Sequence, residues 1–259
     1  MSHPRRVLLQ PAYVLHRRDY RNTSLLVEIL TAEFGRSALI AKGVRAPRSR
    51  WRPLLQPFMP LLISWSGRGE LGSVTDVEAA GRPVHLSGER VYSALYVNEL
   101  LVRLVQRHDP HPGIFALYGD SLQALARSPE AEPILRAFEV ALLAELGYGL
   151  MLEHNASDGG PIEPEALYCY RVESGPVLAS GREPQDGVLV HGRSLMALGG
   201  ALSWDAAARV QAKRLMRYVI DHHLAGRPVR ARELYAASTR RLQTSVDSND
   251  SEADGEQHH

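Results

Sequence analysis

The side chains with the clearest capacity for chemistry are the cations of one short run, residues 41–52. The run contains no acid, and its cations are Lys42, Arg45, Arg48, Arg50 and Arg52. Gly43 and Pro47 interrupt any regular helix or central strand, so we expect an exposed, mobile loop. Uncompensated cations on a loop suit a polyanion, because neutralised phosphates release their counterions. The alternative is a solvated basic loop with no ligand.

The charge of the whole chain is distributed unevenly around this run. Residues 1–52 hold 11 Lys and Arg against 3 Asp and Glu, a net charge of +8. The remaining 207 residues hold 19 and 26, a net charge of −7. This asymmetry indicates an anion-binding module joined to a mildly acidic partner module. Trp51, the aromatic residue of the run, either stacks on a base or buries itself under the module, and the sequence leaves both open.

Two further groups of cations accompany the run. Arg17, Arg18 and Arg21 flank a predicted turn, and Arg36 precedes a predicted strand. In a small barrel, loops at these positions can converge on one binding face, so we include these residues with the run in a candidate nucleic-acid-binding site. Near the C-terminus, Arg227, Arg230 and Arg232 form a second basic cluster, which is either part of that site or a set of solvated arginines on a capped helix.

The elements that must position the basic run are short strands. Residues 13–15, 24–30, 37–41, 61–65 and 71–77 are rich in β-branched, Leu or aromatic residues and are separated by turn signals. Gly67 and Gly69 predict a hairpin turn, because both can take a positive φ. Five strands within about 70 residues, with a long loop after the third, predict a small barrel of the OB-fold or SH3-like type.

The rest of the chain has a helical pattern. Apolar residues recur at helical spacing over residues 91–105, 114–125, 134–146 and 207–224, which predicts a helical bundle. We expect Ser203 to cap the last long helix, Val210 to lie on its buried stripe, and a short helix to follow over 230–236. His222 and His223 are expected at the end of the long helix.

An irregular segment interrupts the bundle at residues 153–192, which are rich in Gly and Pro. Residues 167–172 and 176–179 could pair as a small hairpin, and we expect the segment to lie outside the core. We therefore predict an α+β protein of two domains, residues 1–80 and 81–240, with the insertion at 153–192. Residues 241–259 are acidic and poor in apolar side chains, which predicts a disordered tail.

Arg136 lies beside Leu135 and Phe138 on the third predicted helix. By itself it is expected to be a surface arginine. An arginine next to an apolar groove can also hold an acidic, hydrophobic peptide, so these three residues are a candidate partner-binding site.

Nothing in the sequence argues for an enzyme, a cofactor or a metal. There is no phosphate-binding glycine motif and no nucleophile elbow. His108, Asp109 and His111 are better explained as a Pro-rich helix stop than as metal ligands. The single cysteine, Cys169, excludes an internal disulfide, and no apolar run of about 18 residues is present to span a membrane. The composition favours a cytoplasmic protein.

Several runs in order along residues 7–237 resemble one family, the bacterial DNA repair protein family RecO. The most specific is Ala41-Lys42-Gly43-Val44-Arg45, which follows a predicted strand. The others include residues 13–20, 23–26, 56–58, 98–100, 135–139, 146–148 and 232–235. The resemblance implies an N-terminal five-stranded OB-fold barrel followed by an α-helical domain.

The resemblance also implies a function and partners. RecO-like proteins bind single- and double-stranded DNA, anneal complementary strands and work with RecR. They help to load the RecA recombinase onto DNA coated by the single-stranded DNA-binding protein, whose acidic C-terminal tail they contact. Carried over by position, Lys42 and Arg45 face DNA and Arg136 meets the acidic tail, while Arg48, Arg50, Trp51 and Arg52 are particular to this chain. Some members bind zinc through four cysteines near residues 153–192. Because only Cys169 is present here, packing alone is expected to hold that region.

Two other classes stay open. One is a scaffold protein whose basic loop binds an acidic protein partner without annealing DNA. The other is a nucleic-acid enzyme, which would need clustered acids beside the loop, and residues 36–52 contain none.

Overall fold

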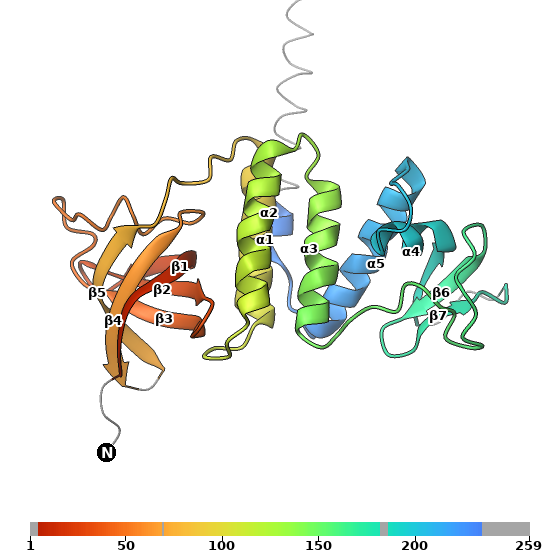
Figure 1. Ribbon diagram of the computed structural model, residues 1–259, viewed down its shortest axis with the longest axis horizontal. Helices are drawn as coiled ribbons and strands as arrows, with labels where there is room; N and C mark the ends of the chain where they lie inside the picture. Colours follow the sequence, from red (N-terminus) through yellow and green to blue (C-terminus); the bar gives the residue numbers. More distant parts are fainter. Residues whose placement is uncertain (1–4, 69, 182–185, 235–259) are drawn as a thin grey trace, which may run out of the picture.

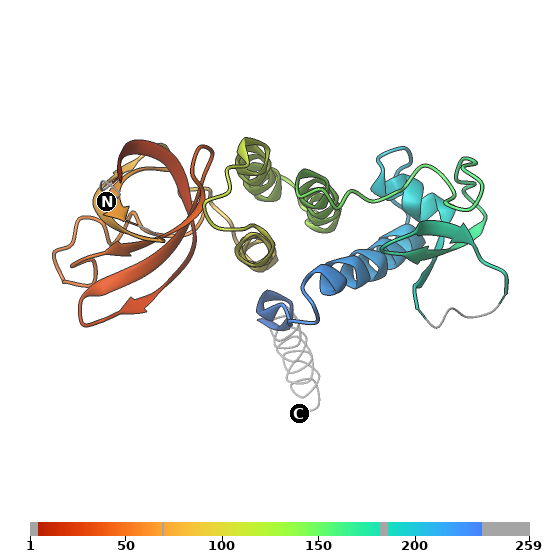
Figure 2. The same cartoon turned by 90° about the horizontal axis from the view of Figure 1, so that it is seen from below.

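The computed structural model describes residues 5–68, 70–181 and 186–234. A barrel of strands lies at one end, long helices fill the middle, and a small sheet lies at the other end (Figure 1). Seen from below, the helices stand between the barrel and the small sheet (Figure 2). The predicted disordered tail lies outside the described residues.

The barrel contains five strands, β1 (Arg5–Tyr20), β2 (Ser24–Thr31), β3 (Gly35–Ala41), β4 (Leu61–Arg68) and β5 (Leu71–Ala79). They close in the order β1-β2-β3-β5-β4, with β3 and β5 parallel and the other pairs antiparallel. This confirms the five-stranded OB-fold barrel. β1 is much longer than predicted, because register shifts after Val7 and Val14 bend it so that it pairs with both β2 and β4.

The predicted hairpin forms between β4 and β5, but Gly67 does not supply a positive φ to its turn. Gly67 lies within β4, where it pairs with Gly72 and has no positive φ, and Gly69 lies outside the described residues. A Cβ placed on Gly67 would stand 2.8 Å from the Cα of Gly72. Gly67 is therefore required by the close approach of two strands.

Three predicted helices are confirmed as α1 (Glu89–Leu104), α2 (Pro112–Arg127) and α3 (Glu132–Glu145). The fourth is α5 (Ala206–His223), with His222 and His223 in its last turn as expected. Two details were wrong. The N-cap is Asp205, whose carboxylate accepts from the Ala208 amide at 2.7 Å, and Val210 is 70% exposed. The buried stripe instead comprises Ala208, Ala212, Leu215, Met216, Val219 and Ile220.

The irregular segment contains the predicted hairpin, β6 (Leu167–Arg171) with β7 (Gly175–Leu178). A third strand, β8 (Val188–His191), and the short helix α4 (Gly192–Leu198) were not predicted. The expectation that this segment lies outside the core was wrong, because Tyr168 and Val190 are buried in the same apolar cluster as the long helices. The expectation that packing alone holds this segment was also incomplete. The buried Asn155 side chain accepts hydrogen bonds from the amide and the hydroxyl of Ser157.

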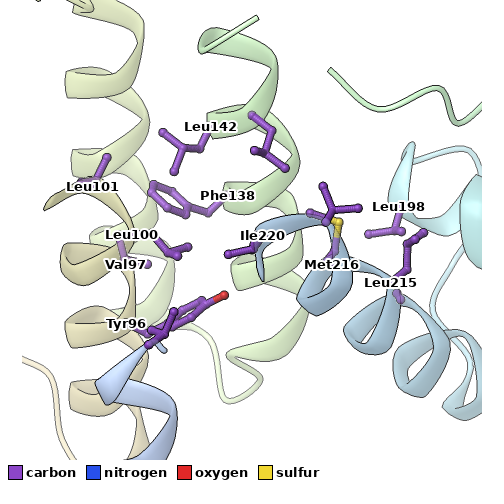
Figure 3. Packing of buried hydrophobic residues seen from close by; sticks show 14 of the residues in the cluster. Tyr96, Val97, Leu100, Leu101, Phe138, Leu142, Leu198, Leu215, Met216 and Ile220 are labelled. Carbon is purple, nitrogen blue, oxygen red and sulfur yellow. The ribbon is translucent and has the colours of Figure 1, made fainter. Parts of the chain in front are cut away.

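The helical core lies where α1, α3 and α5 converge. Phe138 of α3 and Met216 of α5 point into the space between the helices, and the Tyr96 hydroxyl points the same way from α1 (Figure 3). The barrel has its own core, built from the inward-facing residues of all five strands. The two cores are separate clusters, so the contacts between them determine how the barrel sits on the helices.

Polar contacts join the barrel to the helices. The Asn98 side chain of α1 donates to the Leu15 carbonyl of β1 at 2.8 Å and accepts from the Tyr118 hydroxyl of α2 at 2.7 Å. Asn98 is only 2% exposed. The ring of Tyr13 packs edge-on against Tyr118, with 4.9 Å between centroids. Asn98 therefore fixes one strand and two helices at a single buried point.

Replacing Asn98 with Ala is expected to lower the free energy of unfolding by about 2–4 kcal/mol, because the Tyr118 hydroxyl and the Leu15 carbonyl both lose their partner. Urea unfolding followed by circular dichroism measures this. Gln123→Ala, on the exposed face of α2, is the matched control and should change stability little. An Asn98→Ala protein as stable as the control would contradict the role of Asn98.

Candidate nucleic-acid interface

The basic run is part of a segment that hydrogen bonds and buried apolar side chains attach to the barrel. Between β3 and β4, hydrogen bonds close successive turns, from the Ala46 amide to the Gly43 carbonyl and from the Leu55 amide to the Trp51 carbonyl. Val44 and Leu55 are fully buried in the barrel core. Because apolar side chains fasten this segment, its cations are held in fixed positions along the surface of the barrel.

The structure brings the basic run next to the turn between β1 and β2. The Arg45 amide donates to the Thr23 carbonyl at 2.9 Å, and its guanidinium donates to the carbonyls of Arg21 and Asn22. The same guanidinium forms an ion pair with Asp19 at 3.0 Å. Arg45 therefore fastens the run to the turn, so the cations of residues 42–52 and those of residues 17–21 lie at one end of the barrel. We call the surface formed by these two segments the basic end.

The cations of the basic end differ in how freely they can meet a phosphate. Arg50 pairs with Asp76 at 3.0 Å, and Arg17 donates to the Leu55 carbonyl at 3.1 Å. Among the described residues, no side-chain hydrogen bond or ion pair engages the exposed cations Arg18, Lys42, Arg48 and Arg52. These four side chains are thus available to a ligand without the loss of an existing pair.

Arg36 is not part of this surface, and its assignment to the DNA-binding site was wrong. Its guanidinium pairs with the buried Glu28 at 2.9 Å and donates to the Val105 carbonyl at the end of α1. Arg107 completes a cluster by pairing with the same carboxylate. Burial lowers the pKa of Arg36, and the Glu28 carboxylate opposes that effect. Arg36 therefore joins the barrel to the helices. It also compensates the charge of the buried Glu28 carboxylate, which would be costly without a paired cation.

Trp51 packs against the barrel core rather than standing free. Its ring joins the apolar cluster of the barrel, and its indole Nε1 is buried without a hydrogen-bond partner among the described residues. The Arg50 guanidinium lies 5.8 Å from the ring centroid. Of the two alternatives for Trp51, this arrangement favours burial, because the ring packs against the apolar cluster and its Nε1 is shielded from solvent.

The C-terminal cluster is largely engaged in holding the chain together. Arg232 pairs with Asp221 at 2.6 Å and lies 5.5 Å from the centroid of the Tyr96 ring. Burial by itself lowers the pKa of Arg232, but Tyr96 and Asp221 outweigh it and the pKa is raised. Arg232 is therefore engaged within the protein, and its assignment to DNA binding stays a prediction. The side chains of Arg227 and Arg230 are exposed, although Arg227 also donates to the Leu224 carbonyl.

Arg136 is a buried arginine, which corrects the expectation of a surface residue. It is 6% exposed, and its guanidinium donates to the fully buried Glu139 carboxylate at 2.7 Å. The Tyr96 hydroxyl donates to the same oxygen at 2.6 Å. The Arg136 Nε and the second Glu139 oxygen have no partner among the described residues. Phe138 lies in the core and Leu135 is half-buried, so the predicted apolar groove is filled by the protein's own packing.

Sequence reasoning missed two kinds of residue at these sites. The sequence does not predict the structural roles of Asn98 and Glu99, which both hold distant segments in place. The available signal is that Asn98 is a polar residue on the apolar stripe of the helix predicted over 91–105. Tyr20 lies between the cations of the first turn, in the same sequence context that drew attention to Trp51. In the part of the chain that the structure describes, no cluster of three or more potential metal ligands occurs, and no helix is long and apolar enough to cross a membrane.

Comparison with known proteins matches two family models over nearly all of the described chain. The model for the N-terminal part of recombination protein O matches residues 6–82, and the model for its C-terminal part matches residues 85–233. Among curated proteins, the DNA repair protein RecO of Methylococcus capsulatus is 48% identical over 91% of this chain and 96% of its own length.

Two further relatives carry the same name. The DNA repair protein RecO of Nitrosococcus oceani is 48% identical over 88% of this chain and 93% of its own length. The protein of that name from Haemophilus influenzae is 42% identical over 88% of this chain and 95% of its own length. These names state DNA repair and recombination, and none states a catalytic activity.

The buried Glu139 predicts a pH dependence of stability. Burial raises its pKa above the ordinary value of 4.5, although Arg136 and the Tyr96 hydrogen bond act in the opposite direction. The folded state then holds the carboxyl proton of Glu139 more tightly than the unfolded state does. The protonated carboxyl group therefore contributes to stability below about pH 4.5, and this contribution is lost as the pH rises through the raised pKa.

The Glu139→Gln variant has no ionisable carboxyl group at this position and should therefore lack this pH dependence. Urea unfolding of wild type and variant from pH 4.5 to 7.5 should show the wild type losing stability relative to the variant as the pH rises. If the stability of wild type relative to Glu139→Gln instead stays constant or increases with pH, the ion pair with Arg136 outweighs the effect of burial.

Proposed function

Because the chain belongs to the RecO family of DNA repair proteins, we propose that it is a recombination mediator that binds single- and double-stranded DNA and anneals complementary strands. The observation that carries this proposal is the basic end of the barrel, where exposed cations that pair with no other described residue lie together on one OB-fold surface. OB-folds commonly bind nucleic acid through such a face and its loops.

The proposed mechanism of annealing is electrostatic. Two complementary strands repel each other through their phosphates, and cations that neutralise both strands at once lower that repulsion. Lys42 and Arg48 lie on the anchored run, and Arg18 lies on the adjoining strand β1. Such contacts carry no sequence information, so binding is expected to tolerate any sequence and to weaken with salt.

We also propose that the protein acts with RecR to load RecA onto DNA coated by the single-stranded DNA-binding protein, in the cytoplasm at the nucleoid. Family membership supports this part of the proposal. The chemistry of the basic end is consistent with DNA as the ligand. The exposed Arg227 and Arg230, which lie on another part of the molecule, are proposed as secondary DNA contacts.

The second candidate function is a scaffold whose basic end binds an acidic protein. The high density of unpaired cations in this small area is compatible with either ligand. Filter binding with DNA and pull-down with an acidic protein, each over a range of salt, separate the two. A nucleic-acid enzyme would degrade DNA in the presence of Mg²⁺, and loss of substrate in that incubation would favour it.

We predict that Lys42→Ala combined with Arg48→Ala weakens single-stranded DNA binding and reduces the slope of log affinity against log salt. The reduction should be about 1.4, since each phosphate contact contributes roughly 0.7 on single strands. Filter binding over a salt titration measures it. Arg45 is left intact because it fastens the β1–β2 turn, so its loss would disturb the whole surface.

The matched control removes two exposed arginines from the helices, Arg127→Ala with Arg217→Ala. This protein has the same net charge as the double variant of the basic end. Equal salt slopes for wild type and the Lys42→Ala, Arg48→Ala protein would exclude the basic end as the DNA contact.

The acidic tail of the single-stranded DNA-binding protein is proposed to bind at Arg136. The supporting observation is that the Arg136 Nε is buried without a hydrogen-bond partner in the described part of the chain, while the Glu139 carboxylate accepts from Nη2 of the same guanidinium. A carboxylate of the tail could satisfy this donor, with Glu139 as its competitor. Binding would then need a local opening of the packing around α3, because Arg136 is buried.

Arg136→Ala should weaken capture of an acidic tail peptide and leave DNA binding unchanged, while Glu139→Gln should bind the peptide at least as tightly as wild type, because the competing charge is gone. Fluorescence anisotropy with a labelled peptide measures both, and a peptide with amides in place of its carboxylates is the control. Equal affinity of wild type and Arg136→Ala, or equal losses in the two variants, would overturn this assignment.

A further inference from the structure

Tyr20 is an aromatic residue of the basic end that lies outside both apolar clusters of the described residues. It is the last residue of β1, and its side chain is half-buried. Tyr13 and Trp51, in contrast, pack against these clusters. The contact on its ring comes from the guanidinium of the exposed Arg21, whose Cζ lies 5.3 Å from the ring centroid.

The strand register places Tyr20 among the free cations. Arg18 pairs with Leu26 and Tyr20 with Ser24, and because alternate residues of a strand share a face, Arg18 and Tyr20 lie on the same face. On the other side of β2, Leu25 pairs with Ala41, so Lys42 follows at the position beside Ser24. The backbones of Tyr20 and Lys42 are thus two strand spacings apart, on the order of 10 Å.

This arrangement has the chemistry of a site for single-stranded nucleic acid. A guanidinium over an aromatic ring is held by a modest cation–π attraction, which a phosphate can outcompete at an exposed position. When Arg21 turns to a phosphate, the ring that it covered becomes open to a base. Trp51, by contrast, packs against the apolar cluster of the barrel, to which Tyr20 does not belong.

We propose that Tyr20 is the residue on which an unpaired base stacks when DNA occupies the basic end, with Arg18, Arg21 and Lys42 holding the adjoining phosphates. This inference rests on the proposed function, since it assumes that DNA binds there. It gives the cations and Tyr20 different roles in binding. The cations serve single and double strands alike, whereas Tyr20 serves only strands whose bases are free, because the bases of a duplex are already stacked inside it.

The test compares wild type, Tyr20→Ala and Tyr20→Phe on three ligands. These are a single-stranded oligonucleotide, a strand of the same length composed of abasic sites, and the matching duplex, at one salt concentration. Tyr20→Ala should lose about tenfold in affinity for the base-bearing single strand and should bind the abasic strand and the duplex as wild type does. Tyr20→Phe keeps the ring and should match wild type on all three.

Each contrary result has its own meaning. Equal losses on all three ligands would assign Tyr20 a structural role and overturn the proposal, as would wild-type affinity of Tyr20→Ala for the base-bearing strand. If wild type binds none of the three ligands, the proposed DNA-binding function fails, independently of Tyr20. Circular dichroism and thermal unfolding of each variant confirm that the compared proteins are folded.

Discussion

One turn of α1 makes the polar contacts on which the arrangement of the molecule depends. Tyr96 donates to Glu139 of α3, Asn98 binds the backbone of β1, and Glu99 accepts from the Arg230 and Ala231 amides of the C-terminal segment. Two of these side chains are buried, and a buried polar group without a partner is costly. These hydrogen bonds therefore hold the barrel, α3 and the C-terminal segment in this arrangement, because another arrangement would leave buried polar groups without partners.

The barrel uses a different principle to present its charges. Like charges repel, so a run with several cations and no acid would by itself spread out in solution. Here Val44 and Leu55 fasten the run to the barrel core, and Arg45 ties it to the turn between β1 and β2. The cations that remain free are thus held close together before any ligand arrives. Holding them in place beforehand reduces the ordering that binding would otherwise require.

Burial divides the arginines of this chain into two classes. Arg36, Arg136 and Arg232 lie beside carboxylates in the interior or at internal junctions, where removing one partner would leave the other charge uncompensated. Arg18 and Arg48 lie in solvent, where a charge contributes little to folding and can be used for binding. The same residue type therefore holds the domains together in one place and offers a contact to phosphate in another.

The sequence by itself determined the elements and the location of the binding module. Enrichment in β-branched, Leu and aromatic residues between turn signals and apolar stripes at helical spacing are local properties, so the five strands and the long helices could be predicted. The excess of cations in residues 1–52 is likewise visible without a structure. What only the tertiary structure decided is which cations are free. Arg36 meets Glu28 and Arg107 across a strand pair and a domain junction. Arg136 is buried beside Glu139, whose carboxylate also accepts from Tyr96 of the sequence-distant helix α1. Burial and pairing depend on neighbours that no local pattern specifies, and for the same reason Trp51 and Tyr20, alike in sequence context, differ in what covers their rings.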